Sequence, residues 1–184
     1  MQGFVNLASD LGEVIAILIP LICYLSAGGI LIASGWGLWQ MNRPGSFYEK
    51  HPWVPFVGPL FAGMLLTFDR VLNEGTNTMG GGGATASMAA AVTSYTPPTV
   101  DPSTLLGTTP EATLLAIITT FIFFFRSYGA LVVLLGLFKL KAVVDGNKRG
   151  HTGTSLVMIV FGFCVMNVDV ICAAIMSHWQ STAT

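Results

Sequence analysis

Residues 14–41 form one uninterrupted apolar run that contains no Asp, Glu, Lys or Arg. The hydrocarbon core of a bilayer is about 30 Å thick, and about 20 helical residues are needed to cross it. A helix satisfies its own backbone hydrogen bonds, which lipid cannot do. The run therefore predicts a transmembrane helix and makes an all-α integral membrane protein the expected fold class.

Three further apolar segments reach the same length when each is allowed one or two charges inside the membrane. They cover residues 54–73, 112–140 and 154–177. The composition agrees with this interpretation, because 53% of the residues are hydrophobic and only 9% are charged. About a quarter of the residues in an average soluble domain are charged. We expect four transmembrane helices arranged as two helical hairpins.

The basic residues are concentrated around the two predicted hairpin loops. Six of the eight Lys and Arg residues lie there: Arg43, Lys50, Lys139, Lys141, Lys148 and Arg149. The N-terminal segment and the long central connection carry acidic residues instead, among them Asp10 and Glu111. The positive-inside rule then places both loops in the cytoplasm, and both termini and the connection outside. The six charges are expected as this orientation signal, and contact with lipid phosphate or a transported polymer is the alternative.

The central connection is rich in glycine and proline, which is typical of a linker or surface loop. It contains MGGGGATASMAAA followed by SYTPPTVDPS. Its four consecutive glycines are not followed by the GK[ST] of a phosphate-binding loop. We expect a first hairpin at residues 1–73, an external linker at 74–110 and a second hairpin at 111–184.

The two hairpins show signs of an internal duplication. A shift of 100 positions aligns four identical pairs: Gly29 with Gly129, His51 with His151, Phe61 with Phe161 and Asp69 with Asp169. With one gap, GLWQMN at 37–42 falls on GLFKLK at 136–141. The pattern predicts a duplicated helix–loop–helix unit with both copies in the same orientation.

Four charged residues are expected to lie at one depth in the membrane. Asp69, Arg126 and Asp169 are each 15 residues from the cytoplasmic end of their predicted helix, and Arg70 lies beside them. Isolated charges at that depth are costly, so pairing within the chain or with a neighbouring subunit is expected. A structural ion pair is favoured over a proton or ion relay because Arg keeps its proton. Ser26 occupies the repeat position of Arg126, so the network is expected to be asymmetric.

Small residues on the first helix favour close helix packing. Gly29, Ala33 and Gly37 recur every fourth residue, a spacing that lets two helices approach within or between subunits. The three cysteines lie in apolar stretches without a CxxC or Cys/His pattern, so neither a disulfide framework nor a metal site is expected. No catalytic set with recognisable spacing is present, so we expect no enzymatic activity.

The second hairpin combines an apolar span ending in GLFKLK, a short charged loop with an Asp, and a second span containing glycine. In this pattern residues 128–169 resemble the small inner-membrane subunits of type IVB secretion and conjugation systems, the TraQ and IcmC/DotE-like group. The first hairpin matches that group only weakly. The resemblance implies a bacterial inner-membrane location and a structural role in a secretion or conjugation apparatus.

A hairpin with a basic cytoplasmic loop is also similar to the mature pilins of type IV secretion systems, whose helices pack into a tube with phospholipid between subunits. This likeness implies bound phospholipid and, for the lysines and arginine of the second loop, a position facing the lumen. The chain departs from those pilins in its length and in its long linker.

The first functional hypothesis is therefore a structural subunit that assembles with copies of itself, and with other secretion or conjugation subunits, into a pilus or channel. DNA or protein would pass through it only transiently. The alternative is a small-solute or ion transporter that uses the intramembrane Arg and Asp residues. A third hypothesis is an accessory protein that scaffolds larger partners.

Overall fold

The structure, a computed structural model, describes residues 2–80, 86–88, 110–146 and 151–182. Every regular element in these residues is a helix, which confirms the all-α fold class. The helices are α1 (Gln2–Gln40), α2 (Phe47–Lys50), α3 (Val54–Leu66), α4 (Phe68–Thr78), α6 (Pro110–Val144), α7 (Thr152–Met166) and α8 (Val168–Thr182).

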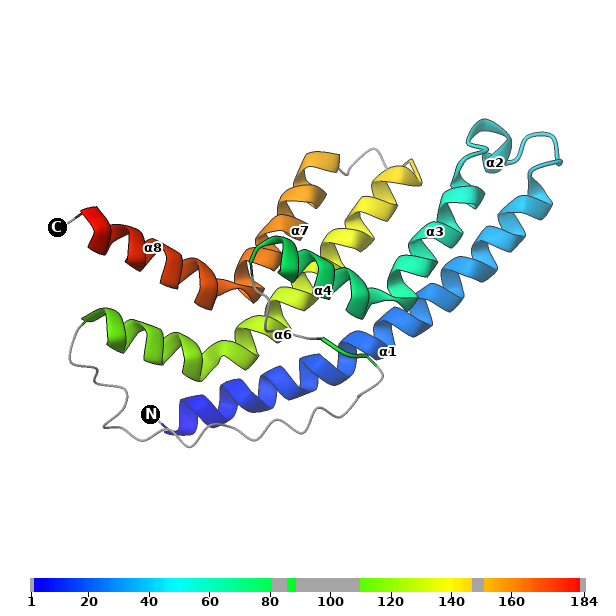
Figure 1. Cartoon of the computed structure of the whole chain (residues 1–184). Helices are drawn as coiled ribbons and strands as arrows, with labels where there is room; N and C mark the ends of the chain where they lie inside the picture. Colours follow the sequence, from blue (N-terminus) through cyan, green and yellow to red (C-terminus); the bar gives the residue numbers. More distant parts are fainter. Residues whose placement is uncertain (1, 81–85, 89–109, 147–150, 183–184) are drawn as a thin grey trace.

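The helices form two pairs that lie side by side. α1 packs along α3, α6 packs along α7, and α1 also packs against α6, which joins the pairs (Figure 1). The end of α6 and the turn between α1 and α3 lie toward one end of the molecule, and the start of α1 and the end of α8 lie toward the other (Figure 1). The described residues thus contain two packed helix pairs, and the duplicated hairpin arrangement across a membrane stays a prediction.

Two helices are long and apolar enough to cross a membrane by themselves, namely residues Asn6–Gln40 of α1 and Ala116–Val144 of α6. The other candidates are the pairs α3–α4 and α7–α8, each bent by 75° at a break. At 1.5 Å per residue, the 13 residues of α3 rise only about 20 Å. The chain therefore has two to four candidate membrane spans, depending on whether each bent pair is one span.

The two breaks are alike and lie 100 positions apart, at Thr67 and Asn167. Both residues leave the helical conformation, with φ and ψ of −111° and 36° at Thr67 and −109° and 28° at Asn167. Thr67 Oγ1 donates to the carbonyl oxygen of Gly63 at 2.9 Å, and Asn167 Nδ2 donates to that of Phe163 at 3.0 Å. A side chain that bonds to the carbonyl one turn earlier competes with the helix and bends it. The continuous second and fourth helices expected from the sequence are therefore each divided in two.

The second pair is held together by a close glycine contact. A Cβ added at Gly162 would lie 2.8 Å from the carbonyl oxygen of Gly129 and 2.9 Å from the backbone nitrogen of Val133. One turn further along α6, a Cβ at Gly136 would lie 3.3 Å from the carbonyl oxygen of Ser155. The backbones of α6 and α7 therefore approach each other along a stripe formed by Gly129, Val133 and Gly136.

The first pair uses the same spacing of residues on α1. A Cβ added at Gly58 of α3 would meet Ser34 Oγ at 1.9 Å and Ile30 Cγ2 at 3.6 Å, and one at Gly37 would meet Pro55 Cγ at 3.1 Å. The stripe Ile30, Ser34, Gly37 therefore matches 129, 133, 136 of α6 with an offset of 99. The repeat is thus present in the helix contacts as well as in the sequence.

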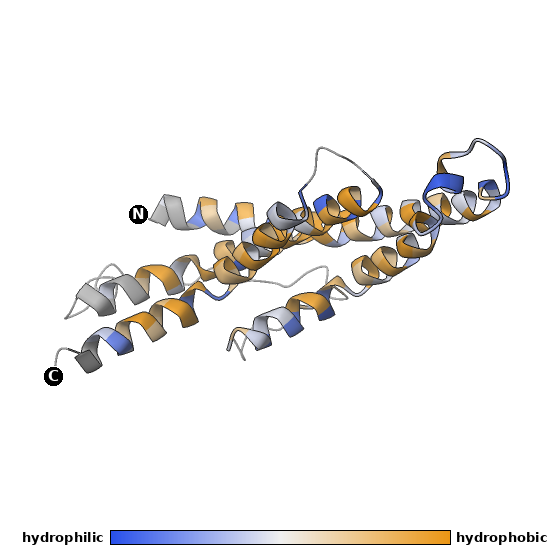
Figure 2. Cartoon of the chain, turned by 90° about the horizontal axis from the view of Figure 1, so that it is seen from above, coloured by the Kyte–Doolittle hydropathy of each residue, from blue (hydrophilic) through white to orange (hydrophobic). Residues whose placement is uncertain are grey.

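Large apolar side chains remain exposed on the outer faces of both pairs. Ile32 is 76% exposed, Val157 67% and Leu60 64%. Hydrophobic residues cover most of the length of the helices, and the turn between α1 and α3 is hydrophilic (Figure 2). Apolar surface of this extent is unusual on a soluble monomer and is compatible with a membrane protein.

The beginning of the predicted linker is attached to the helices. α4 continues to Thr78, beyond the expected boundary at residue 73. Asn73 then donates from Nδ2 to the carbonyl oxygen of Ala86 at 2.9 Å and accepts from the Ala86 N–H at 2.7 Å. Met88 is buried in the hydrophobic core. Part of residues 74–110 therefore packs against the first repeat, and residues 81–85 and 89–109 lie outside the described residues.

Candidate functional site

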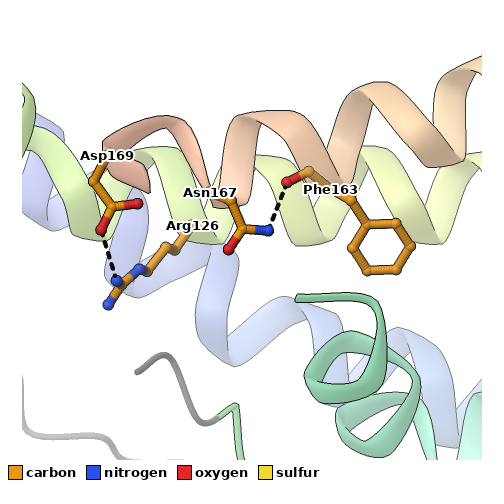
Figure 3. Close-up of polar contacts among 4 residues, drawn as sticks. All are labelled: Arg126, Phe163, Asn167 and Asp169. Atoms are coloured by element: carbon orange, nitrogen blue, oxygen red, sulfur yellow. Dashed lines mark hydrogen bonds and ion pairs between the residues drawn. The ribbon is translucent and has the colours of Figure 1, made fainter. Parts of the chain in front are cut away.

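Arg126 and Asp169 form an ion pair between the two halves of the second repeat. Arg126 lies near the middle of α6, and Asp169 lies in the first turn of α8, directly after the break. Arg126 Nη2 is 3.3 Å from Asp169 Oδ2 (Figure 3), and about a third of each side chain is exposed. An acidic residue in the first turn also complements the helix dipole of α8. The structure thus brings together two of the four residues of the predicted charge network.

The contact between the two side chains is incomplete. Arg126 Nε and Asp169 Oδ1 are both buried and have no hydrogen-bond partner among the residues that the structure describes. An Arg–carboxylate pair is strongest when two parallel hydrogen bonds form, and here the geometry provides one. The neighbouring Asn167 is 1% exposed and uses its Nδ2 to hold the break (Figure 3). The site is therefore a polar cluster at a discontinuous helix, with one donor and one acceptor still available.

Asp69 and Arg70 make a local contact with each other, and their place in the expected network of four stays a prediction. Asp69 is in the first turn of α4, and its Oδ1 accepts from the backbone N–H of Arg70 at 2.9 Å. Within residues 2–80, 86–88, 110–146 and 151–182 neither side chain forms an ion pair. The helix contacts also change the predicted counterpart of Arg126. An offset of 99 pairs Arg126 with Ala27, which is fully buried, and not with Ser26.

The basic residues of the two loops differ in their surroundings. The guanidinium carbon of Arg43 lies 4.0 Å from the centroid of the Trp39 ring, which is a cation–π geometry. Lys141 pairs with Asp145, one turn later on α6. Lys50 and Lys139 are exposed. Lys148 and Arg149 lie outside the described residues, so their predicted roles stay predictions.

The two loops are close to each other. Trp53 Nε1 donates to the carbonyl oxygen of Val144 at 3.5 Å. A Cβ added at Gly146 would lie 4.0 Å from Phe47 Cζ. The first loop therefore contacts the end of α6, and the described basic residues Arg43, Lys50, Lys139 and Lys141 lie toward one end of the molecule.

The small residues predicted for helix packing are only partly used within the chain. Gly37 is buried against Tyr48 and Pro55, whereas Gly29 and Ala33 are exposed. The contacting stripe is shifted by one residue to Ile30 and Ser34. A role for Gly29 and Ala33 between subunits stays a prediction.

The breaks at Thr67 and Asn167 were not expected, although the sequence carries a signal for them. Each is a residue type that favours helix ends and is followed two positions later by an Asp, at Asp69 and Asp169. In the part of the chain that the structure describes, no three His, Cys, Asp or Glu side chains gather as a metal site would require. The expectation of no metal and no cofactor other than phospholipid stays a prediction.

No protein-family model matches the chain, and no curated protein or solved structure is significantly similar to it.

Proposed function

We propose that the chain is a non-enzymatic structural subunit of a conjugative or type IVB secretion apparatus, which assembles with copies of itself into a pilus or channel. One observation carries the proposal, namely that the chain repeats one helix–loop–helix unit twice in the same orientation. The unit recurs in the breaks at Thr67 and Asn167 and in the contact stripes on α1 and α6.

Parallel repetition favours assembly because the contact between the repeats is heterologous. Besides the contact between the counterpart helices α1 and α6, α4 of the first repeat meets α7 of the second, and these two helices are not counterparts. Heterologous contacts can be repeated from chain to chain, and they generate rings or helical filaments. The exposed apolar surface described above provides area for such contacts in a membrane.

The arrangement also suits four crossings of a bacterial inner membrane, with each bent pair as one broken span. The two loops lie together at the end that carries Arg43, Lys50, Lys139 and Lys141. The positive-inside rule then assigns that end to the cytoplasm and the termini to the other side. In an extracellular pilus the same loops would face the lumen, where DNA or protein passes and where phospholipid neutralises them.

The test is electron microscopy of appendages sheared from expressing cells and of gently detergent-extracted membranes, with mass spectrometry to identify this chain. Helical tubes or large rings that contain it are the expected result. Monomers in the membrane fraction, with nothing in the sheared fraction, would refute assembly. Discrete small oligomers would leave the transporter as the better proposal.

The transporter is a second candidate because the Arg126–Asp169 pair lies at a discontinuous helix and retains an unused donor and acceptor. Secondary transporters often place their substrate sites at broken helices. This reading predicts that Arg126→Gln and Asp169→Asn each abolish solute or proton flux in proteoliposomes. Asp69→Asn is the matched control, since Asp69 lies outside the pair. Wild-type flux from Arg126→Gln and Asp169→Asn, as from the Asp69→Asn control, would exclude the transporter.

A further inference from the structure

The contact between α4 and α7 joins the two repeats, and Gly75 makes it possible. A Cβ added at Gly75 would lie 2.1 Å from Phe163 Cε1 and 2.2 Å from Phe163 Cζ. The Phe163 ring points away from α7 on the side where α4 lies (Figure 3). A large ring on the second repeat therefore occupies the space left by a missing side chain on the first.

At the positions that correspond to Gly75 and Phe163 in the other repeat, the glycine is replaced by a large residue and the large residue by a glycine. One hundred positions from Gly75 is Ile175, on α8, and one hundred positions from Phe163 is Gly63, on α3. The offset of 100 holds for these helices because the breaks at 67 and 167 coincide in it. The first repeat thus has Gly on α3 and Gly on α4, whereas the second has Phe on α7 and Ile on α8.

The second version of this contact is not made among the described residues. Ile175 is 54% exposed, and a Cβ added at Gly63 would meet no atom within 4 Å. α8 and α3 lie on opposite sides of the molecule, with α6 and α7 between them (Figure 1). α4 of the first repeat reaches α7 of the second, whereas the matching contact between α8 and α3 is not made among the residues that the structure describes.

We propose that α8 of one chain docks on α3 of a second copy, so that Ile175 of the first lies against Gly63 of the second. The inference rests on the self-assembly of the proposed function and names the contact that produces it. As in the contact between Phe163 and Gly75, a large residue faces a glycine. In the proposed contact the large residue, Ile175, lies on α8 after the break, whereas Phe163 lies on α7 before it. The contact continues the internal interface from head to tail, and its rotation decides whether a ring or a filament results.

The test is disulfide cross-linking between two differently tagged full-length chains in the membrane, after Cys23, Cys164 and Cys172 have been replaced by Ala. One chain carries Gly63→Cys and the other carries Ile175→Cys. After oxidation we expect a mixed dimer in about tenfold excess over a control pair, because docking raises the effective concentration of the two thiols. The control pairs Ile175→Cys with Val157→Cys, an exposed residue on α7.

A second measurement separates this contact from assembly in general. Native mass spectrometry compares the wild type with Gly63→Trp, which fills the proposed acceptor site, and with Gly153→Trp, a control glycine that also has no atom within 4 Å of an added Cβ. We expect Gly63→Trp to reduce the oligomer to single chains and Gly153→Trp to leave it intact. Oligomers that persist in Gly63→Trp, without the mixed disulfide, would overturn this contact and leave the proposed assembly standing. Single chains in the wild type would overturn both.

Discussion

Gly129 lies in the contact between α6 and α7, and we predict that Gly129→Ala forces these helices apart. The added Cβ would lie 2.6 Å from Met166 Cγ, 2.7 Å from the carbonyl oxygen of Gly162 and 2.9 Å from the backbone nitrogen of Met166. Two of these three atoms are backbone and cannot rotate away. Restoring an ordinary contact of 3.4 Å to that oxygen requires the helices to separate by about 0.7 Å, a large change for a close-packed interface.

The expected loss of stability follows from two opposing effects. Overpacking of a well-packed contact costs about 1–3 kcal/mol. Replacing Gly by Ala inside a helix contributes up to about 1 kcal/mol in the other direction. We therefore expect Gly129→Ala to lower the free energy of unfolding by about 1–2 kcal/mol. Gly29→Ala is the matched control, because it is the same change 100 positions earlier and meets no atom within 4 Å.

The assay is unfolding of the purified chain in mixed micelles by increasing amounts of SDS, followed by circular dichroism and tryptophan fluorescence. Gly29→Ala should unfold at the wild-type concentration or above it, and Gly129→Ala below it. Equal midpoints for the two variants would show that α6 and α7 do not meet through Gly129. The close contact derived from the structure would then be wrong.

Three further predictions concern the break, the ion pair and the loops. Asn167→Leu removes the hydrogen bond to the carbonyl one turn earlier and should straighten α7–α8, which spin labels on either side of residue 167 would report as a longer distance; an unchanged distance would assign the bend to other contacts. A double-mutant cycle of Arg126→Gln and Asp169→Asn should give a coupling energy of about 0.5–1.5 kcal/mol in the SDS assay, and additive effects would mean that the pair contributes nothing. Arg43→Gln should reduce the preference for spin-labelled phosphatidylglycerol over phosphatidylcholine about fivefold, whereas Lys141→Gln should change it less because the charge of Lys141 is already paired with Asp145. Equal effects of the two variants would show that only the total charge of the loops matters, and not the surroundings of each residue.

The sequence predicted those features of the structure that depend on hydrophobicity and on the positions of charged residues. The apolar segments, the all-helical fold and the closeness of Arg126 to Asp169 all follow from run lengths and from spacing along helices. It did not predict which face of each helix packs. α1 is apolar all round, so Gly29 and Ala33 were as plausible as Ile30 and Ser34.

The breaks were missed for a related reason. Residues 54–73 and 154–177 are long enough to be read as single spans, and that length concealed the helix-end residues Thr67 and Asn167 inside them. The sequence indicates Asp69 and Asp169 only as charges inside the membrane, whereas the structure places each in the first turn of a new helix. The length of the apolar segments thus favours one continuous span, although Thr67 and Asn167 are residue types that favour the end of one helix and the start of another.

The attachment of Ala86 and Met88 to the first repeat affects how the chain can be divided into fragments. A fragment that ends at residue 73 contains Asn73 without its backbone partner and leaves an opening in the core where Met88 lies. A fragment that ends at residue 88 keeps both. During synthesis Asn73 therefore gains its backbone partner only after the ribosome has translated past α4 and into the connection. Split-protein reporters and separately expressed halves should be joined beyond residue 88.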